Sequence, residues 1–187
     1  MATTKTTNSQ TITHSLGYPR IGAKRELKKA TEAYWKGLLS LEDLLATGKY
    51  LRSVNWKKQQ DAGIDLIPVN DFSFYDQVLD MSCLLGNVPP RFRGNEAQTD
   101  VETAFTIARG TQSGASLVDD EKDCQTGKVS TFASEMTKWF DTNYHYIVPE
   151  FSEDTEFSLS SQKVFEEFEE AKALGINAKP ILIGPIT

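Results

Sequence analysis

Apolar residues recur at two different spacings along this 187-residue chain. Short, nearly continuous apolar runs are typical of strands covered on both faces, as in parallel sheets. Between these runs, apolar residues recur at every third or fourth position, which is the spacing of an amphipathic helix. The pattern predicts strands at 14–19, 64–71, 144–151 and 178–187.

Helices are predicted between the strands, and several carry a start or stop signal. Helical spacing covers 25–36, 41–63, 74–86, 101–110 and 161–175, and 133–143 is interpreted as a helix end leading into the third strand. Ser40 is placed to cap the second helix, Gly48 is a candidate break within it, and Gly63 is a natural stop. Either Asp71 or Ser73 is placed to cap the third helix. The last helix is expected to carry one apolar stripe, formed by Val164, Phe165, Phe168, Ala171 and Leu174.

This alternation of strands and helices predicts an α/β fold with parallel pairing and right-handed crossovers. A complete (β/α)8 barrel takes about 250 residues, and four strands cannot close one. We therefore expect the N-terminal part of a (β/α)8 TIM-type barrel, with about half the strands, incomplete as given. The alternative is an open sheet whose last edge is covered by another chain. The partial barrel domain is expected to span 14–187, after a disordered, polar lead at 1–13.

Composition places the chain among ordinary globular proteins of the cytoplasm. Its formal net charge of −6 argues against nucleic acid as a partner. It has no apolar run of membrane-spanning length and neither a secretory signal nor a transit peptide, so no membrane association is expected. The cysteines and histidines lie far apart in sequence, so no metal site and no structural disulfide is predicted from them. They are Cys83, Cys124, His14 and His145.

Charge is unevenly distributed within this acidic chain. Residues 20–36 hold six cations against two acids, whereas 150–170 hold eight acids against one base. Such a regional asymmetry indicates a small anionic ligand or a complementary surface.

The basic stretch follows a glycine-containing turn, "GYPRIG", at 17–22. Glycines allow close backbone approach, and a helix that starts just beyond offers free N–H groups to an anion. Lys24, Arg25 and Lys28 recur at spacings that place their side chains on one helix face. The alternative is a solvated face in which Glu32 pairs with a nearby lysine. The stretch is neither a P-loop nor a dinucleotide fingerprint.

Two other places hold candidate chemistry. Asn70 and Asp71 follow a buried strand, where active sites of parallel α/β folds collect, although helix capping explains Asp71 equally well. The stretch 135–150 is dense in polar and aromatic residues, but His145 within it is more simply a structural, hydrogen-bonded residue. Neither a nucleophile with its base nor a catalytic carboxylate pair stands out.

Four long segments, in order, resemble the N-terminal barrel of the cobalamin-independent methionine synthase family. They are "LGYPRIGAKRELKKATEAYWKG", "AGIDLIPVNDFSFYDQVLD", "EMTKWFDTNYHYIVPEF" and "KALGINAKPILIGPIT". The resemblance covers 14–187, with 111–131 looking like a variable loop. It implies a part of a methyltransferase that moves the methyl group of 5-methyltetrahydropteroyltri-L-glutamate to L-homocysteine, giving L-methionine without cobalamin.

The family's chemistry is implied to lie in a second, C-terminal barrel. There, zinc held by His, Cys, Glu and Cys binds homocysteine as a thiolate, which is the nucleophile. None of those ligands matches a residue of this chain, so it is expected to bind no metal, to hold no catalytic residue and to be inactive in isolation.

The resemblance assigns substrate binding, and above all the polyglutamate tail, to six residues. They are Arg25, Glu26, Leu27, Lys28, Lys138 and Asn143. The alternative, from another functional class, is a structural or self-associating half-barrel with no ligand of its own.

Overall fold

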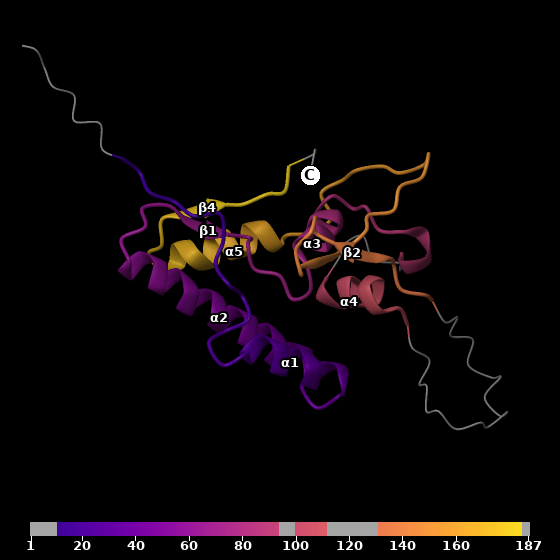
Figure 1. Cartoon of the computed structure of the whole chain (residues 1–187), viewed down its shortest axis with the longest axis horizontal. Coiled ribbons are helices and arrows are strands. Elements are labelled where there is room, and N and C mark those ends of the chain that lie inside the picture. The colour runs from indigo at the N-terminus through magenta and orange to yellow at the C-terminus, as the bar shows by residue number, and fades with distance from the viewer. Residues whose placement is uncertain (1–10, 94–99, 112–130, 185–187) are drawn as a thin grey trace, which may run out of the picture. The chain divides into compact units, whose positions relative to one another are not determined.

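The computed structural model describes residues 11–93, 100–111 and 131–184. They form two compact units: Met1–Asp71 with Glu167–Ile181, and Phe72–Glu166 with Leu182–Thr187. Figure 1 labels the helices and strands of both units. Each unit is described by itself below.

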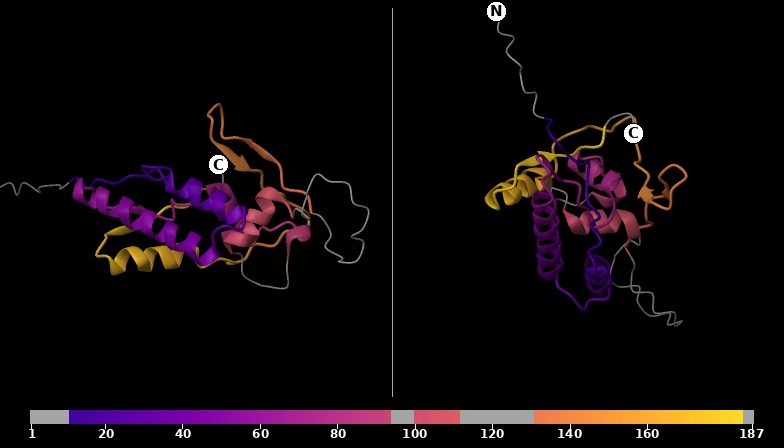
Figure 2. Two further views of the ribbon diagram at one scale, coloured as in Figure 1. Left: turned by 90° about the horizontal axis from the view of Figure 1, so that it is seen from below. Right: turned by 60° about the vertical axis from the view of Figure 1, so that its left-hand side comes forward.

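Two antiparallel helices build one side of the first unit. Helix α1, Glu26–Trp35, and helix α2, Leu41–Asp61, pack against each other (Figure 2). Ser40 caps α2 as predicted, because its hydroxyl accepts the Asp43 N–H at 3.1 Å. Gly48 does not break the helix; it lies buried within it. Gly63 follows the helix with φ +82°, a conformation that favours glycine.

Parallel strands form the other side of the first unit. Strand β1, Ile67–Val69, pairs in parallel with β4, Ala178–Pro180, in the register Ile67 to Ala178. An isolated parallel bridge joins His14 to Leu66. The segments therefore lie in the order 14, β1, β4, which is also their order along the chain. Helices α2 and α5, Lys163–Ala173, contribute to the buried cluster beside them, which contains Trp56, Ile67, Val69, Ala171 and Ile176.

The second unit is built from short helices and a hairpin. Its elements are α3 (Gln77–Leu84), the 3-10 turn η1 (Pro90–Phe92), α4 (Val101–Arg109), β2 (Met136–Lys138) and β3 (His145–Ile147). Strands β2 and β3 pair antiparallel. One buried cluster joins α3, α4 and β3; it contains Leu79, Cys83, Val88, Ala104, Ile107, Ala108 and Ile147.

Several sequence predictions are wrong in detail. The stretch 133–143 contains strand β2 rather than a helix end, and β3 pairs with it antiparallel, so β3 is not a parallel strand. Asp76 caps α3, in place of Asp71 or Ser73, and accepts the Val78 N–H at 2.7 Å. On α5, Ala171 is fully buried but Phe165 is 52 % exposed, so the apolar stripe is narrower than its sequence pattern.

The mixed α/β character and the parallel pairing of β1 with β4 are confirmed. Within the described ranges, no helix combines the length and apolar character that crossing a membrane requires.

Candidate functional site

The turn that precedes α1 is held by its own backbone and by Glu26. Arg25 occupies the N-cap position in the left-handed conformation, with φ +62° and no side-chain cap. Glu26 Oε2 accepts the Lys24 N–H at 2.8 Å. Hydrogen bonds from the backbone N–H groups of Glu26 itself and of Lys24 hold the pKa of the Glu26 carboxyl below its ordinary value.

Two further backbone donors at this helix start are also occupied. Arg25 N–H donates to the Gly22 carbonyl and Leu27 N–H donates to the Ile21 carbonyl, both at 3.2 Å. The expectation that free N–H groups would bind an anion here is therefore wrong for these donors.

Asp71 holds the glycine turn from the carboxyl end of β1. Its Oδ2 accepts the Tyr18 N–H at 2.8 Å, and a Cβ added to Gly17 would lie 3.3 Å from the same oxygen. Asp71 is buried, with 9 % of its surface exposed. Its carboxylate therefore supports the turn that leads toward the basic helix.

The basic residues of this stretch differ in exposure. Lys24, Arg25, Lys28 and Lys29 are exposed, whereas Leu27 packs in the core at 2 % exposure. Lys28 Nζ lies 3.5 Å from Glu32 Oε1, and both side chains are nearly half exposed. This pair matches the alternative given in the sequence analysis, in which Glu32 pairs with a nearby lysine on a solvated helix face. Such an exposed pair contributes little stability.

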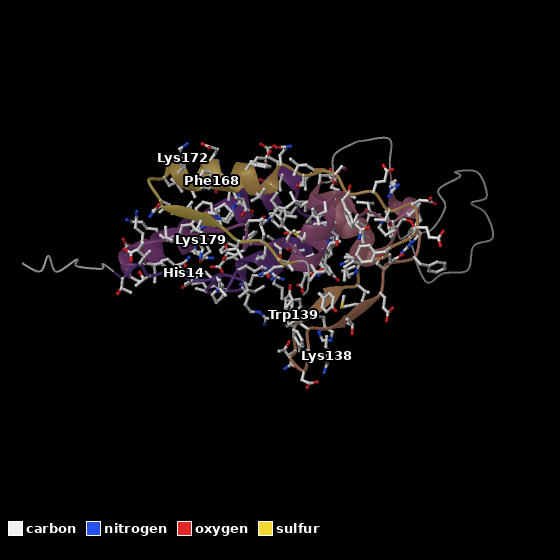
Figure 3. The ribbon with its side chains drawn as sticks, turned by 90° about the horizontal axis from the view of Figure 1, so that it is seen from above. His14, Lys138, Trp139, Phe168, Lys172 and Lys179 are labelled. Carbon is white, nitrogen blue, oxygen red and sulfur yellow. The ribbon has the colours of Figure 1, made fainter. Side chains whose placement is uncertain are left out.

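Lys138 and Asn143 lie on the β2–β3 hairpin of the second unit. Lys138 is an exposed residue of β2 opposite His145. Next to it, Trp139 makes edge-on ring contacts with Phe140, Tyr144 and Tyr146, at centroid distances of 5.5, 6.4 and 5.6 Å. Figure 3 labels Lys138 and Trp139 on this hairpin. The Asn143 carbonyl lies 3.0 Å from His145 Nδ1, which gives His145 a structural contact.

A buried carboxylate anchors the hairpin. Asp76 is 1 % exposed; its Oδ1 accepts from Val78 and Leu79, and its Oδ2 accepts the Ile147 N–H at 3.1 Å. The Tyr144 hydroxyl accepts the Gln77 N–H at 3.2 Å. Sequence reasoning missed Asp76, although an Asp directly before an apolar helical pattern is the usual N-cap signal.

The six predicted substrate-binding residues thus fall into two local groups. Residues 25–28 belong to the first unit, and Lys138 and Asn143 belong to the second. Each group is organised by contacts within its own unit.

Metal-binding residues do not gather in the described part of the chain. No group of three or more His, Cys, Asp or Glu side chains there is placed to hold a metal ion. Cys83 is a buried cysteine, and His14 Nδ1 lies 2.7 Å from Lys179 Nζ (Figure 3). Zinc, as implied by the family resemblance, has no fitting site among these residues.

Comparison with known proteins matches the chain to one family and to many relatives. Proteins named 5-methyltetrahydropteroyltriglutamate–homocysteine methyltransferase from Salinibacter ruber and Proteus mirabilis are each 53 % identical to it, over 92 and 93 % of this chain. The protein of the same name from Nitrosomonas europaea is 52 % identical over 95 % of the chain. The chain spans only 21 to 22 % of the length of these three relatives.

The family model described as the N-terminal domain of cobalamin-independent synthase matches residues 12–187. This range includes the basic turn, the hairpin and all four described strands. The chain therefore belongs to the family of cobalamin-independent synthase N-terminal domains.

Proposed function

We propose that this chain supplies folate-tail binding to a methyltransferase that makes L-methionine from L-homocysteine and 5-methyltetrahydropteroyltri-L-glutamate. The observation that carries the proposal is the exposed, basic turn at 24–28, within a chain that belongs to this family. The names of the relatives support the substrates. The family resemblance of the sequence segments described above is the ground for proposing six binding residues: Arg25, Glu26, Leu27, Lys28, Lys138 and Asn143.

The chemistry of the ligand suits these residues. A triglutamate tail carries several carboxylates, and guanidinium or ammonium groups pair with carboxylates through charge-assisted hydrogen bonds. Arg25 is exposed at the N-cap of α1, Lys28 is exposed in the first turn of that helix, and Lys138 is exposed on an anchored hairpin. A tail held away from the reacting carbon contributes affinity and positioning, and not bond-making.

For the fold, we propose the first part of a (β/α)8 barrel. The parallel order 14, β1, β4 supports it, because neighbouring strands of such a barrel follow chain order. In this proposal 14–187 is a partial barrel domain, and most of the polar lead at 1–13 and of the loop at 111–131 lies outside the described residues.

The methyl transfer itself is proposed to use groups outside this chain. Zinc and homocysteine would be bound by the family's C-terminal barrel, and the described residues offer them no matching site. The cytoplasm is the proposed compartment, in keeping with biosynthetic relatives.

Titration of the purified chain with triglutamyl and monoglutamyl 5-methyltetrahydrofolate tests the binding proposal. We expect the triglutamyl form to bind more tightly and Lys28→Ala and Lys138→Ala each to reduce that preference. Lys36→Ala is the matched control, because it removes an exposed cation beyond the end of α1. Equal affinity for the two forms would contradict tail binding.

Sizing of the same sample tests the structural alternative. A monomer that prefers the triglutamate supports the binding function. A self-associated chain with no preference supports a structural half-barrel.

A further inference from the structure

We propose that Glu26 is a positioning residue for the anionic tail: its carboxylate holds the 22–25 turn so that Arg25 and Lys28 meet the ligand, and it does not itself contact the ligand. This inference rests on the tail-binding function proposed above. The family resemblance groups Glu26 with the neighbouring cations as a ligand contact, whereas this inference gives Glu26 a separate, positioning role.

The Glu26 carboxylate is turned back onto the loop that precedes it. Its Oε2 accepts the Lys24 N–H at 2.8 Å. A carboxylate at a helix N-terminus occupies the position that an external anion would take. The Glu26 carboxylate therefore takes this position at the start of α1.

The conformation of Arg25 depends on this contact. Arg25 stands between the bonded Lys24 N–H and the carboxylate of Glu26, with φ +62°. Residues other than glycine adopt this conformation only at a cost, so neighbouring contacts must hold it. The Lys24–Glu26 hydrogen bond and the Arg25–Gly22 backbone bond do so. Glu26 thereby sets the direction in which Arg25 leaves the turn.

Gly22 shows how closely the carboxylate fits the loop. A Cβ at Gly22 would collide with Glu26 Oε2, and it would lie 3.0 Å from Leu51 Cδ2. Gly22 also has φ +85°, which disfavours any side chain. A change at Gly22 should therefore displace the Glu26 carboxylate without removing any charge.

A purely electrostatic role and a positioning role predict opposite effects of a Glu26 substitution on the affinity for the tail. If Glu26 were only a nearby negative charge, its removal would strengthen binding of a polyanionic tail. If Glu26 positions Arg25, its removal weakens binding, although the local charge becomes more favourable.

Binding measurements with triglutamyl 5-methyltetrahydrofolate distinguish these two roles. The variants to titrate are Glu26→Ala, Glu26→Gln and Gly22→Ala. We expect Glu26→Ala to weaken binding about fivefold, the size of a lost helix cap, and Gly22→Ala to weaken it similarly. Glu26→Gln should retain most of the affinity, because an amide oxygen still accepts the Lys24 N–H. Affinity for the monoglutamyl form should change much less, which a general loss of folding would not produce.

Glu32→Ala is the matched control. It also removes a carboxylate from α1, but one that pairs with Lys28 in solvent and takes no part in the turn. We expect its triglutamate affinity to be unchanged or up to about twofold tighter. Tighter binding by Glu26→Ala, to the same extent as by Glu32→Ala, would overturn the positioning role.

An NMR pH titration of the ligand-free chain tests the hydrogen bond between the Lys24 N–H and the Glu26 carboxylate independently of ligand binding. The Lys24 amide proton should shift with the Glu26 carboxyl at a midpoint below the ordinary 4.5, and Glu26→Gln should abolish that transition. A Lys24 amide that does not respond would overturn the inference even if the tail binds. Conversely, a normal Lys24 titration with no triglutamate preference in the wild type would contradict tail binding, and with it the ligand role of Glu26.

Discussion

The turn before α1 and the β2–β3 hairpin carry the two groups of proposed binding residues, and they are held in different ways. Contacts within a few residues hold the turn, such as Lys24 N–H to Glu26. The hairpin is held from far along the chain, by Asp76, which lies 71 residues before Ile147. The first arrangement can be encoded locally, whereas the second exists only once α3 and β3 have packed.

The two units also stabilise buried charge differently. In the first unit, Arg52 lies between Glu167 and Glu170, with N–O distances of 3.7 and 2.6 Å, and Glu167 Oε2 also accepts the Asn70 N–H. In the second unit, backbone N–H groups surround the Asp76 carboxylate. Opposite charge offsets desolvation in one unit and peptide dipoles offset it in the other.

The largest effect is expected from Arg52→Leu. It removes the cation that pairs with the buried Glu167 and the partly buried Glu170, which costs about 3–5 kcal/mol of unfolding free energy. Denaturant unfolding measures this loss. The control Lys57→Ala breaks an exposed pair with Asp61, at 3.0 Å, and should cost less than about 0.5 kcal/mol. Equal losses of unfolding free energy in Arg52→Leu and Lys57→Ala would show that solvent screens the charges around Arg52.

Asp76→Ala should have the next largest effect. It removes the cap of α3 and the tie to Ile147, and we expect a loss of about 2–3 kcal/mol. Faster hydrogen exchange at the Ile147 amide should accompany it. Asp100→Ala removes the exposed cap of α4, bonded at 2.8 Å, and should cost only about 1 kcal/mol. An unchanged Ile147 exchange rate would contradict the anchoring role.

Glu150 should make the stability of the second unit depend on pH. The bidentate hydrogen bonds from Arg91, both 2.6 Å, lower the pKa of the Glu150 carboxyl below its ordinary 4.5, with help from Ser134. A lowered pKa contributes stability that is present above 4.5 and lost as pH falls through the folded value. Because the pair is more than a third exposed, the loss should be about 1 kcal/mol.

Unfolding measured across the acid range checks this dependence. Glu150→Gln should flatten it below the ordinary carboxyl pKa, whereas Glu153→Gln, in an exposed loop, should leave the slope as in the wild type. If Glu150→Gln left the pH dependence of the unfolding free energy unchanged, groups other than Glu150 would cause the loss of stability in acid.

The smallest effect is expected from Ser40→Ala, which removes the cap of α2. The cost should be about 0.5 kcal/mol, because water replaces part of the exposed bond to Asp43. Ser40→Asp should restore the thermal midpoint. A larger loss of unfolding free energy would show that the Ser40 cap contributes more to the stability of the first unit than its exposure indicates.

Local signals predicted much of the first unit. Helices α1 and α2, the Ser40 cap and the stop at Gly63 follow from periodicity and end chemistry over a few residues. The continuous apolar run around Ile67 predicted a strand, and β1 is buried at all three residues.

The second unit was harder to predict because its contacts are distant in sequence. Strand β2 is exposed at all three residues, so it carries no apolar pattern that would distinguish it from a helix end. Asp76 was overlooked as a cap because two other polar residues stood closer to the preceding strand.

The sequence by itself determined the family, the parallel strand β1, the helices of the first unit and the positive charge of the turn. Only the tertiary structure decided that Asp71 supports the Gly17 turn from 53 residues away, and that Asp76 anchors the hairpin. The physical reason is that composition and periodicity report which side chains prefer burial or a helix. The partner that satisfies a given N–H or carboxylate depends on which segments meet when the chain folds.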